Sequence, residues 1–423
     1  MTKSINPRQS LITVENIYKA KVRLKQVAVE TPLVPNLNFS DQYDCNLFLK
    51  REDLQVVRSY KIRGAYNKMV STPPEILANG VVAASAGNHA QGVALACQLL
   101  GVNGKIFMPS TTPKQKIDKV KLFGKERVQI ELIGDTYDAC YNAALEEVRT
   151  ANKLLVPPFD DIKIVEGQGT VGSEILEACD VPIDYLFLAV GGGGLAAGVG
   201  SYFRQISPNT KIIGVEPEGA PAMKKSLEAG KVVTLDTIDT FVDGAAVQRV
   251  GDLNFEICKN VLDDIILVPE GKVCTSILQL YNEEGIVAEP AGALTIAALD
   301  FYRDEIKGKN VVVIISGGNN DITRTEEIKE RSLLYEGLKH YFVIRFPQRA
   351  GALREFVNHV LGENDDITFF EYNKKTNRGL GPAVVGIEVQ NKKDYKALLK
   401  RMKDHNFDYQ ALNESPMLFE FLI

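Results

Sequence analysis

The spacing of hydrophobic residues changes twice along the chain, and each change indicates a different kind of structure. Leu11, Val14, Ile17, Tyr18 and Val22 recur at helical spacing, which predicts an amphipathic helix at the start. The segment 31–35, with two prolines, is expected to end that helix and to lead into an extended stretch. Short, continuous apolar runs then alternate with amphipathic stretches; the predicted strands are residues 47–49, 81–84, 105–108, 128–133, 154–156, 185–190, 211–215, 265–268 and 311–315.

This alternation predicts an α/β region built on mainly parallel sheets. Strands that are apolar throughout, rather than at every second position, are typical of parallel sheets covered by helices on both faces. In such folds ligands bind beyond the carboxyl ends of the strands, at the N-termini of the following helices. The loops that follow Ala84, Val190 and Ile315 are therefore the candidates for a site.

The last part of the chain has a different pattern. Residues 320–339 are charged and helical in character, which indicates a neck. Beyond it, strands are predicted at 341–346, 367–372, 383–389 and 417–423, with helices near 353–360 and 395–402. The order β-α-β-β-α-β is that of a ferredoxin-like α+β unit, and it occurs once.

Composition narrows the possible classes of function. The chain has 423 residues and a net charge of −5, which argues against nucleic acid or a membrane surface as its partner. Six scattered cysteines without a C-x-x-C pair and only four histidines predict no metal site, and the thiols are expected to be free in a reducing cytoplasm. Residues 185–203 carry no charge, but their six glycines favour a buried strand, a loop and a helix start over a membrane span.

The candidate chemistry centres on Lys61, in the sequence Ser59-Tyr60-Lys61-Ile62-Arg63-Gly64. Apolar neighbours place this lysine at the opening of a helix that continues through Met69. Burial of a lysine lowers its pKa, and the neutral amine is the nucleophile that Schiff-base chemistry requires. On its own the motif is also compatible with an ordinary solvated lysine.

Gly191-Gly192-Gly193-Gly194-Leu195 follows a predicted strand and opens a predicted helix. Backbone N–H groups without side chains at a helix N-terminus form a cradle for phosphate or carboxylate. A rival interpretation exists, because residues 192–197 satisfy G-x-G-x-x-A and Glu216 ends the next strand, as in a dinucleotide fingerprint. A nicotinamide-dependent dehydrogenase would, however, leave Lys61 without a role.

Two further loops lie at predicted strand ends. In Ser85-Ala86-Gly87-Asn88-His89 the backbone N–H groups could hold a carboxylate and the Asn88 amide could donate to a phenolate oxygen, although Asn88 could instead cap the following helix. In Ser316-Gly317-Gly318-Asn319 the hydroxyl of Ser316 could bond a heterocyclic nitrogen, but the segment is also a good turn.

Together these motifs resemble the threonine ammonia-lyase (threonine dehydratase) family of fold-type-II pyridoxal-phosphate enzymes. The resemblance rests on residues 50–55, 59–65, 85–92, 191–195, 288–293 and 316–319 and covers about residues 30–320. The tail resembles the single ACT-like regulatory domain of short biosynthetic members, with residues 349–353 at its first strand-to-helix turn. The implied organisation is a two-lobed catalytic region over 1–330 (smaller lobe about 55–157), a neck over 331–340 and an ACT-like domain over 341–423.

The resemblance also implies roles for individual residues. Lys61 is the Schiff-base lysine and the general base; Gly191, Gly192, Gly193, Gly194 and Leu195 hold the phosphate of pyridoxal 5'-phosphate. Asn88 faces the ring hydroxyl of the cofactor and Ser316 its pyridine nitrogen. Ser85, Gly87, Asn88 and His89 form the loop over the substrate carboxylate. The implied reaction is β-elimination of L-threonine, with L-serine as a secondary substrate, to 2-oxobutanoate and ammonia in isoleucine biosynthesis.

Three residues depart from the pattern of related enzymes. Ala86 stands where serine racemase-like members have a second serine, so racemisation is expected to be poor. Ala222 stands where those members have the second carboxylate of a divalent-metal site, and only Glu216 remains, so we expect no such metal. Tyr60 replaces the usual phenylalanine.

The resemblance implies, finally, that the tail senses a branched-chain amino acid, isoleucine or alternatively valine, in a cytoplasmic homotetramer. A tail that only mediates assembly is the alternative for this domain. For the whole chain the alternatives are a dehydratase-racemase of the same fold, a nicotinamide-dependent dehydrogenase, and an amino-acid-binding regulator with an inactive catalytic core.

Overall fold

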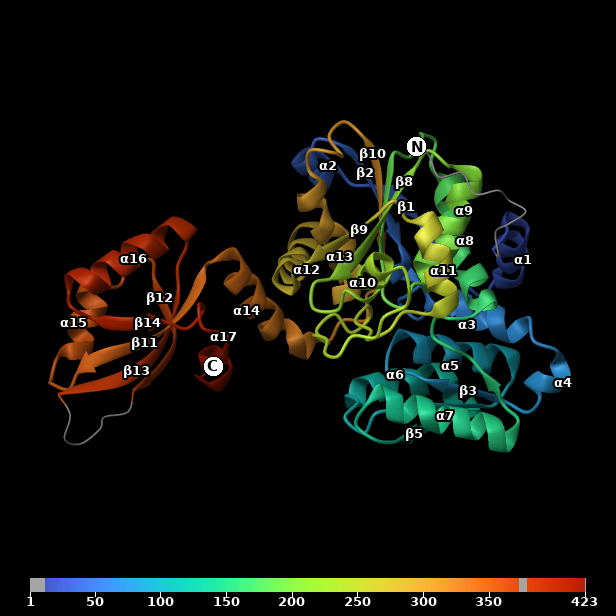
Figure 1. The fold of residues 1–423 in the computed structure, drawn as a ribbon, viewed down its shortest axis with the longest axis horizontal. Coiled ribbons are helices and arrows are strands. Elements are labelled where there is room, and N and C mark those ends of the chain that lie inside the picture. Colours follow the sequence, from blue (N-terminus) through green and yellow to red (C-terminus); the bar gives the residue numbers. More distant parts are fainter. Residues whose placement is uncertain (1–11, 373–378, 423) are drawn as a thin grey trace. The chain divides into compact units, whose positions relative to one another are not determined.

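The computed structural model describes residues 12–372 and 379–422 and divides the chain into two compact units, Met1–Ile322 and Thr323–Ile423 (Figure 1). The first unit contains two sheets and the second contains one. The α/β class predicted for the first and the α+β class predicted for the second are confirmed.

The larger sheet of the first unit has six strands in the order β1-β2-β10-β7-β8-β9. Its strands are β1 (Leu33–Pro35), β2 (Asn46–Arg51), β7 (Tyr185–Ala189), β8 (Lys211–Pro217), β9 (Asp264–Val268) and β10 (Asn310–Ile315). All neighbours are parallel except β1, which runs antiparallel to β2 at the edge. Every residue of β7 is buried, because helices cover both faces of this sheet, as continuous apolar strands require.

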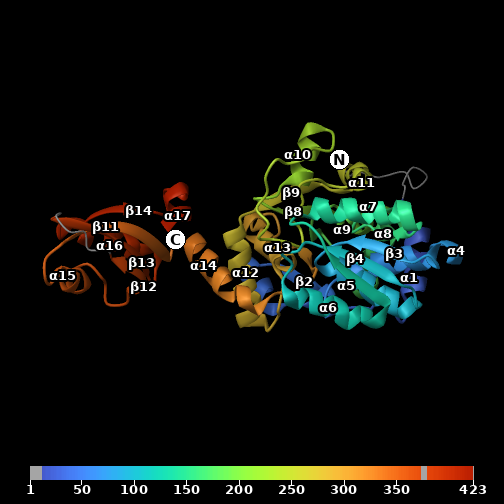
Figure 2. The ribbon, with the colours of Figure 1, turned by 90° about the horizontal axis from the view of Figure 1, so that it is seen from below.

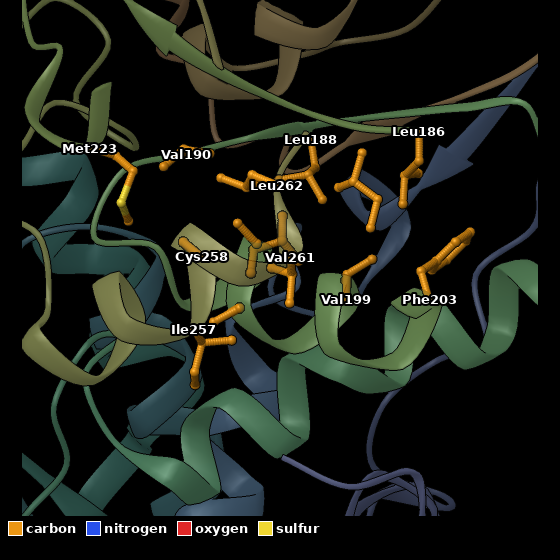
Figure 3. Packing of buried hydrophobic residues seen from close by; sticks show 14 of the residues in the cluster. Leu186, Leu188, Val190, Val199, Phe203, Met223, Ile257, Cys258, Val261 and Leu262 are labelled. Carbon is orange, nitrogen blue, oxygen red and sulfur yellow. The ribbon is translucent and has the colours of Figure 1, made fainter. Parts of the chain in front are cut away.

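One face of the larger sheet packs on α8 (Ile162–Ala178), α9 (Gly194–Ile206) and α11 (Asp252–Val261). Leu186 and Leu188 point from β7 into this layer, on the side of Val199 and Phe203 of α9, and Val190, just after β7, belongs to the same cluster (Figure 3). The other face packs on α13 (Pro290–Ala297). The remaining helices of this lobe are α2 (Leu37–Tyr43), α10 (Ala222–Ala229) and α12 (Glu270–Glu284).

The smaller sheet has four parallel strands in the order β5-β4-β3-β6. These are β3 (Val81–Ala84), β4 (Gly104–Met108), β5 (Val128–Leu132) and β6 (Leu154–Leu155), with the helices α3 (Lys61–Val70), α4 (Pro74–Leu77), α5 (Asn88–Leu100), α6 (Lys114–Gly124) and α7 (Tyr137–Ala151). Apolar residues of α3, α5 and α6 cover one face, and Cys140 and Ala144 of α7 cover the other. Figure 2 shows α6 and α7 on opposite sides of β3 and β4.

The opening helix, α1 (Val14–Leu24), exists as predicted, but its buried face is different. Ile17, Ala20 and Leu24 are buried, whereas Tyr18 and Val22 are 64% and 57% exposed, so assigning those two to the apolar face was wrong. The helix also ends at Leu24, well before the prolines at 32 and 35. Leu11 lies outside the described residues.

The second unit begins with α14 (Thr325–Glu336) and contains a four-stranded antiparallel sheet in the order β12-β13-β11-β14. Its elements are β11 (Lys339–Pro347), α15 (Ala352–His359), β12 (Asp366–Tyr372), β13 (Leu380–Glu388), α16 (Lys392–Asp404), β14 (Asp408–Ala411) and α17 (Pro416–Leu422). The fourth strand was misplaced by the sequence analysis: residues 408–411 form it, and the predicted strand at 417–423 is helix α17 as far as Leu422. The ferredoxin-like order of elements still holds.

The uncharged span from 185 to 203 forms β7, a glycine loop and most of α9, as expected. Among the residues that the structure describes, no helix is long and apolar enough to cross a membrane.

Candidate active site

Lys61 is the first residue of α3 and lies where several loops of the first unit meet. The residues just before it are held by the loop after β10, because the N–H of Tyr60 donates to the carbonyl of Ser316 (3.3 Å) and Ser59 forms a β-bridge with Gly317. The amine of Lys61 donates to the backbone carbonyl of Pro158 at 2.9 Å. The predicted helix start is therefore confirmed, and the lysine is fixed at both its backbone and its Nζ atom.

The surroundings of Lys61 favour its neutral amine. Burial lowers the pKa of Lys61 to about 8, and the negative charge of Glu289 opposes this shift. Lys61 is partly buried and its amine is bonded to Pro158, which sets it apart from the ordinary solvated lysine that was the alternative for this motif. At neutral pH a usable fraction of the side chain is unprotonated, as a nucleophile or a general base requires.

The glycine loop lies against the segment that binds Lys61. A Cβ atom at Gly192 would lie 2.2 Å from the ring of Phe159, the residue after Pro158, and one at Gly194 would lie 3.2 Å from the backbone oxygen of Phe159. Gly193 has a φ of +91°, which strains any residue with a side chain. Glycine is thus needed here for close approach and for backbone conformation.

The carbonyl groups of this loop are bound by the elements behind it. The carbonyl of Gly192 accepts from the Nδ2 atom of Asn254 (2.8 Å) and from the N–H of Gly251 (3.2 Å), and that of Gly193 accepts from Ala197 at the first turn of α9. None of the backbone N–H groups of residues 191–195 donates to another described residue. Four glycines at the N-terminus of a 13-residue helix therefore fit a phosphate group.

Asn88 joins the two lobes. Its Nδ2 atom donates to Oε1 of Glu289 at 2.6 Å, and its Oδ1 atom accepts from Nδ2 of Asn319 at 2.7 Å. Asn88 is the first residue of α5 rather than its cap; Gly87 occupies the cap position and no side chain caps this helix. The capping role considered for Asn88 is therefore wrong.

The side chains of Ser85 and His89 are bonded within the protein, which leaves the backbone of the 85–89 loop as its open part. The Ser85 hydroxyl accepts from the N–H of Gly87 (3.2 Å), and a Cβ atom at Gly87 would meet nothing within 4 Å, so this position is open. His89 is only 3% exposed, and burial lowers its pKa to about 3, with a further contribution from Lys61. Its Nε2 lies 2.8 Å from the carbonyl of Val156, which can only accept, so the neutral ring carries its proton on Nε2.

Ser316 is 3% exposed and follows the last residue of β10. Its carbonyl bonds Tyr60, so it lies beside the start of α3, at the carboxyl ends of the strands where ligands were expected.

The rival dinucleotide fingerprint does not survive in the structure. A ribose would need the carboxylate of Glu216, but both of its oxygens accept from the start of α10, from the N–H groups of Met223 (2.7 Å) and Lys224 (2.9 Å). Burial raises the pKa of this group to about 8. The expectation that no divalent metal binds near Glu216 stays a prediction.

A group of buried charges that the motifs did not predict includes Arg63, two residues after Lys61. Arg63 donates to both oxygens of Glu52 (2.8 Å each) and to both oxygens of Glu174 (2.6 and 2.8 Å). Lys50 also donates to Glu174, at 2.6 Å. Lys50, Glu52 and Arg63 were part of the quoted motifs, but nothing in the sequence pointed to Glu174, which lies more than 100 residues away on α8.

Glu289 was also missed as a site residue, although it lay in a quoted motif. It is 5% exposed, and burial raises its pKa to about 7, with a smaller contribution from the charge of Asp243. Lys116 of α6 forms an ion pair with Asp243 at 2.5 Å. A perturbed carboxyl beside Lys61 is the kind of group found at functional sites.

Comparison with known proteins gives matches to both units. Residues 24–317 match the family of pyridoxal-phosphate-dependent enzymes, and residues 330–422 match the C-terminal regulatory domain of threonine dehydratase. The chain is 59% identical to a biosynthetic L-threonine dehydratase of Halalkalibacterium halodurans over 97% of this chain and 99% of the relative. It is 58% identical to that of Bacillus subtilis over the full length of both.

Solved structures give the same picture. Threonine deaminase isoform 2 of Solanum lycopersicum, in its processed form, superposes with a TM-score of 0.72 at 41% identity, covering 78% of this chain and 93% of that one. Maize serine racemase superposes with a TM-score of 0.70 at 30% identity, covering 77% and 98%.

Proposed function

The chain belongs to the biosynthetic L-threonine dehydratases, pyridoxal-phosphate-dependent enzymes with a C-terminal regulatory domain, and from this premise we propose which of its residues perform the reaction and its regulation. We propose that Lys61 is the catalytic residue, in the β-elimination of L-threonine to 2-oxobutanoate and ammonia. The observation that carries this proposal is the position of Lys61: at the start of α3, with its amine bonded to Pro158 and its pKa lowered by burial. L-Serine, which lacks only the methyl group of threonine, is the proposed secondary substrate.

The residues of the site fit the cofactor of this family. Gly191, Gly192, Gly193, Gly194 and Leu195 present N–H groups at a helix N-terminus and would hold the phosphate. Asn88 would donate to the ring hydroxyl, and Ser316 would bond the ring nitrogen. When bound, pyridoxal phosphate supplies an aldehyde for covalent attachment to Lys61 and a ring that acidifies the α-hydrogen of the substrate.

The substrate carboxylate is proposed to bind the loop of Ser85, Gly87, Asn88 and His89. The open space at Gly87 and the backbone N–H groups at the start of α5 support this role, since α5 is 13 residues long and its first N–H groups lack helical acceptors. The imidazole of His89 is neutral and bonded to Val156, so it orients the loop and takes no proton.

Lys61 then acts as the general base. Its amine, with a pKa lowered to about 8, would take the α-proton of the bound substrate, and the ammonium so formed would give that proton to the β-hydroxyl, which would leave as water. Ser316 is neutral, so it stabilises negative charge on the ring less than a carboxylate partner would. This suits an elimination, because a hydroxyl that receives a proton can leave as water and a strong electron sink at the ring is not needed.

Turnover by a Lys61→Ala variant tests this assignment. We expect the wild type to release 2-oxobutanoate and ammonia from L-threonine and the variant to release neither, while Lys121→Ala, which changes an exposed lysine on α6, keeps wild-type rates. Near-normal turnover by correctly folded Lys61→Ala protein would refute the assignment.

For the regulatory unit, we propose a branched-chain amino acid as effector, isoleucine first and valine second. A pocket of about 350 Å³ lies at the turn between β11 and α15. Phe346, Leu353, Phe370 and Tyr372 give it an apolar wall suited to an aliphatic side chain, while Arg349 and the backbone at Gly351 suit a carboxylate. Regulatory couplings of this kind are typically about 1–3 kcal/mol, or 5- to 150-fold in affinity.

Calorimetry on the full chain tests the effector proposal. Isoleucine or valine should bind the wild type and shift its threonine kinetics, and Leu353→Asp, which puts a charge in the apolar wall, should abolish both effects but keep unregulated turnover. If neither amino acid binds the wild type, the tail serves assembly, the alternative considered for it.

We further propose a homotetramer in the cytoplasm. The support for the tetramer is the resemblance to the family. All six cysteines are free thiols, which supports a reducing compartment. Light scattering of the purified protein would measure the number of subunits directly.

A further inference from the structure

Four side chains form a continuous line of hydrogen bonds between the two lobes. Nζ of Lys119 donates to Oδ1 of Asn319 at 3.1 Å. Nδ2 of Asn319 donates to Oδ1 of Asn88 at 2.7 Å, and Nδ2 of Asn88 donates to Oε1 of Glu289 at 2.6 Å.

The line crosses between the lobes at every step. Lys119 lies on α6 and Asn88 at the start of α5, both beside the smaller sheet. Asn319 follows β10 of the larger sheet, and Glu289 immediately precedes α13, which packs on that sheet. A cation therefore stands at one end and a carboxyl group at the other, with two amides between them.

The chemistry of the neighbours allows the two amides only one orientation. Nδ2 of Asn319 also donates to the carbonyl of Val57 (2.8 Å), and a carbonyl can only accept, so the NH₂ group of Asn319 must lie on that side. The same NH₂ group meets Asn88, which must therefore present its oxygen to it. The NH₂ group of Asn88 is left facing Glu289, and this bond lowers the pKa of Glu289 against the effect of burial.

The second hydrogen on Nδ2 of Asn88 has no acceptor among the described residues. The inference rests on the function proposed above, in which Asn88 donates to the ring hydroxyl of the cofactor. This second hydrogen is the one that Asn88 can give to that hydroxyl. A flipped amide would present an oxygen to that hydroxyl group in its ionised form and would repel it.

We propose that Asn319 and Lys119 are positioning residues that hold the amide of Asn88 with its NH₂ group toward the cofactor. Asn319 sets the orientation through its bonds to Val57 and Asn88. Lys119 strengthens the arrangement with a charge-assisted hydrogen bond to the far side of the Asn319 amide. Neither residue is expected to touch the reacting atoms.

Asn319→Asp is the sharpest perturbation, because it replaces an NH₂ group with an oxygen at nearly constant volume. Aspartate cannot donate to Val57 or to Asn88, so the Asn88 amide loses its fixed orientation. We expect the dissociation constant of pyridoxal phosphate to rise about tenfold or more, the size of one lost hydrogen bond between buried groups. The visible absorption band of the bound cofactor should change with pH at a different midpoint, because ionisation of the ring hydroxyl loses its donor.

Lys119 provides a milder series with a matched control. Lys119→Met keeps the length of the side chain but removes the donor, and should weaken cofactor affinity about threefold. Lys119→Arg retains a donor and should restore near-wild-type affinity. Lys121→Met changes an exposed lysine on the same helix and should leave both affinity and absorption unchanged.

The test is a titration of each purified full-length protein, freed of cofactor, with pyridoxal phosphate, followed by visible absorbance across pH. Circular dichroism establishes that each variant is folded. If Asn319→Asp does not fold, the Lys119 variants alone test the inference. If Lys119→Met, Lys119→Arg and Lys121→Met all match a wild type that binds the cofactor and deaminates threonine, the inference is wrong while the proposed function stands. If the wild type itself binds no cofactor, the proposed function fails instead.

Discussion

Replacing Arg63 with methionine should destabilise the catalytic unit strongly, because it leaves two buried carboxylates with a single cation. Arg63 is 1% exposed and bonds both Glu52 and Glu174 in forked geometry. Burial alone would raise the pKa of Glu52, but Arg63 and, to a smaller extent, Lys50 and Thr31 lower it below its usual range. Arg63 thus keeps a fully buried carboxylate ionised.

The size of the stability loss in Arg63→Met follows from the charge balance of the four buried side chains. With Lys50, Glu52, Arg63 and Glu174 all ionised, the group is neutral; without Arg63 it carries one uncompensated negative charge in the core. Breaking such a buried pair from one side costs about 3–5 kcal/mol. At about 2.1 cal/mol/K of unfolding entropy per residue, a unit of 322 residues should lose about 4–7 °C in Tm.

Thermal unfolding of single and double variants provides the assay. Arg63→Lys keeps the charge but cannot reach both carboxylates at once, so its loss should be smaller. Arg63→Met combined with Glu174→Gln restores neutrality, with Lys50 left to Glu52, and should be less destabilising than the sum of the two single changes. A Tm for Arg63→Met within about 1 °C of the wild type, or strict additivity in the double variant, would contradict the reasoning.

Three other predictions follow from the same structure. Gly193→Ala should cost about 1–3 kcal/mol, because its φ is +91° and its Cβ would lie 2.8 Å from Met223, and calorimetry should show weaker binding of pyridoxal phosphate as well. Ala86→Ser should add racemisation to an intact elimination; rapid racemisation by the wild type in chiral chromatography would contradict this expectation. The pKa of Glu52 is lowered in the folded state, so its contribution to stability is present above pH about 4.5 and should be lost as the pH falls through that lowered pKa. The Tm of the wild type should therefore fall more steeply with acid than the Tm of Glu52→Gln.

The sheets of the catalytic unit could be predicted because their strands are apolar throughout, which leaves few alternatives to burial. The errors fell where that signal is weak. Residues 408–411 form an edge strand with mostly exposed side chains, and their sequence Asp-Tyr-Gln-Ala is too short and too weakly apolar for its alternation to indicate a strand. Residues 417–422 are apolar enough for a strand but form a helix whose Phe421 is 80% exposed.

In the site, sequence could locate the loops but not which side chains meet across them. Lys61 and the glycine loop stand out locally, through their motifs and their places at helix starts. The bonds from Asn88 to Glu289 and from Lys119 to Asn319 each join residues about 200 positions apart, and no local pattern encodes such a distance. The opening helix shows the same limit, since Ile17 packs against α8, a contact that helical periodicity alone does not specify.

The most direct test of the account is to find where the cofactor is attached. The protein purified with pyridoxal phosphate is treated with borohydride, which makes the attachment permanent, and its peptides are examined by mass spectrometry. The account predicts that the cofactor mass is found on the peptide containing Lys61 and is absent from Lys61→Ala protein treated in the same way. A cofactor attached to another lysine, or no attachment in a wild type that converts threonine, would contradict the central claim.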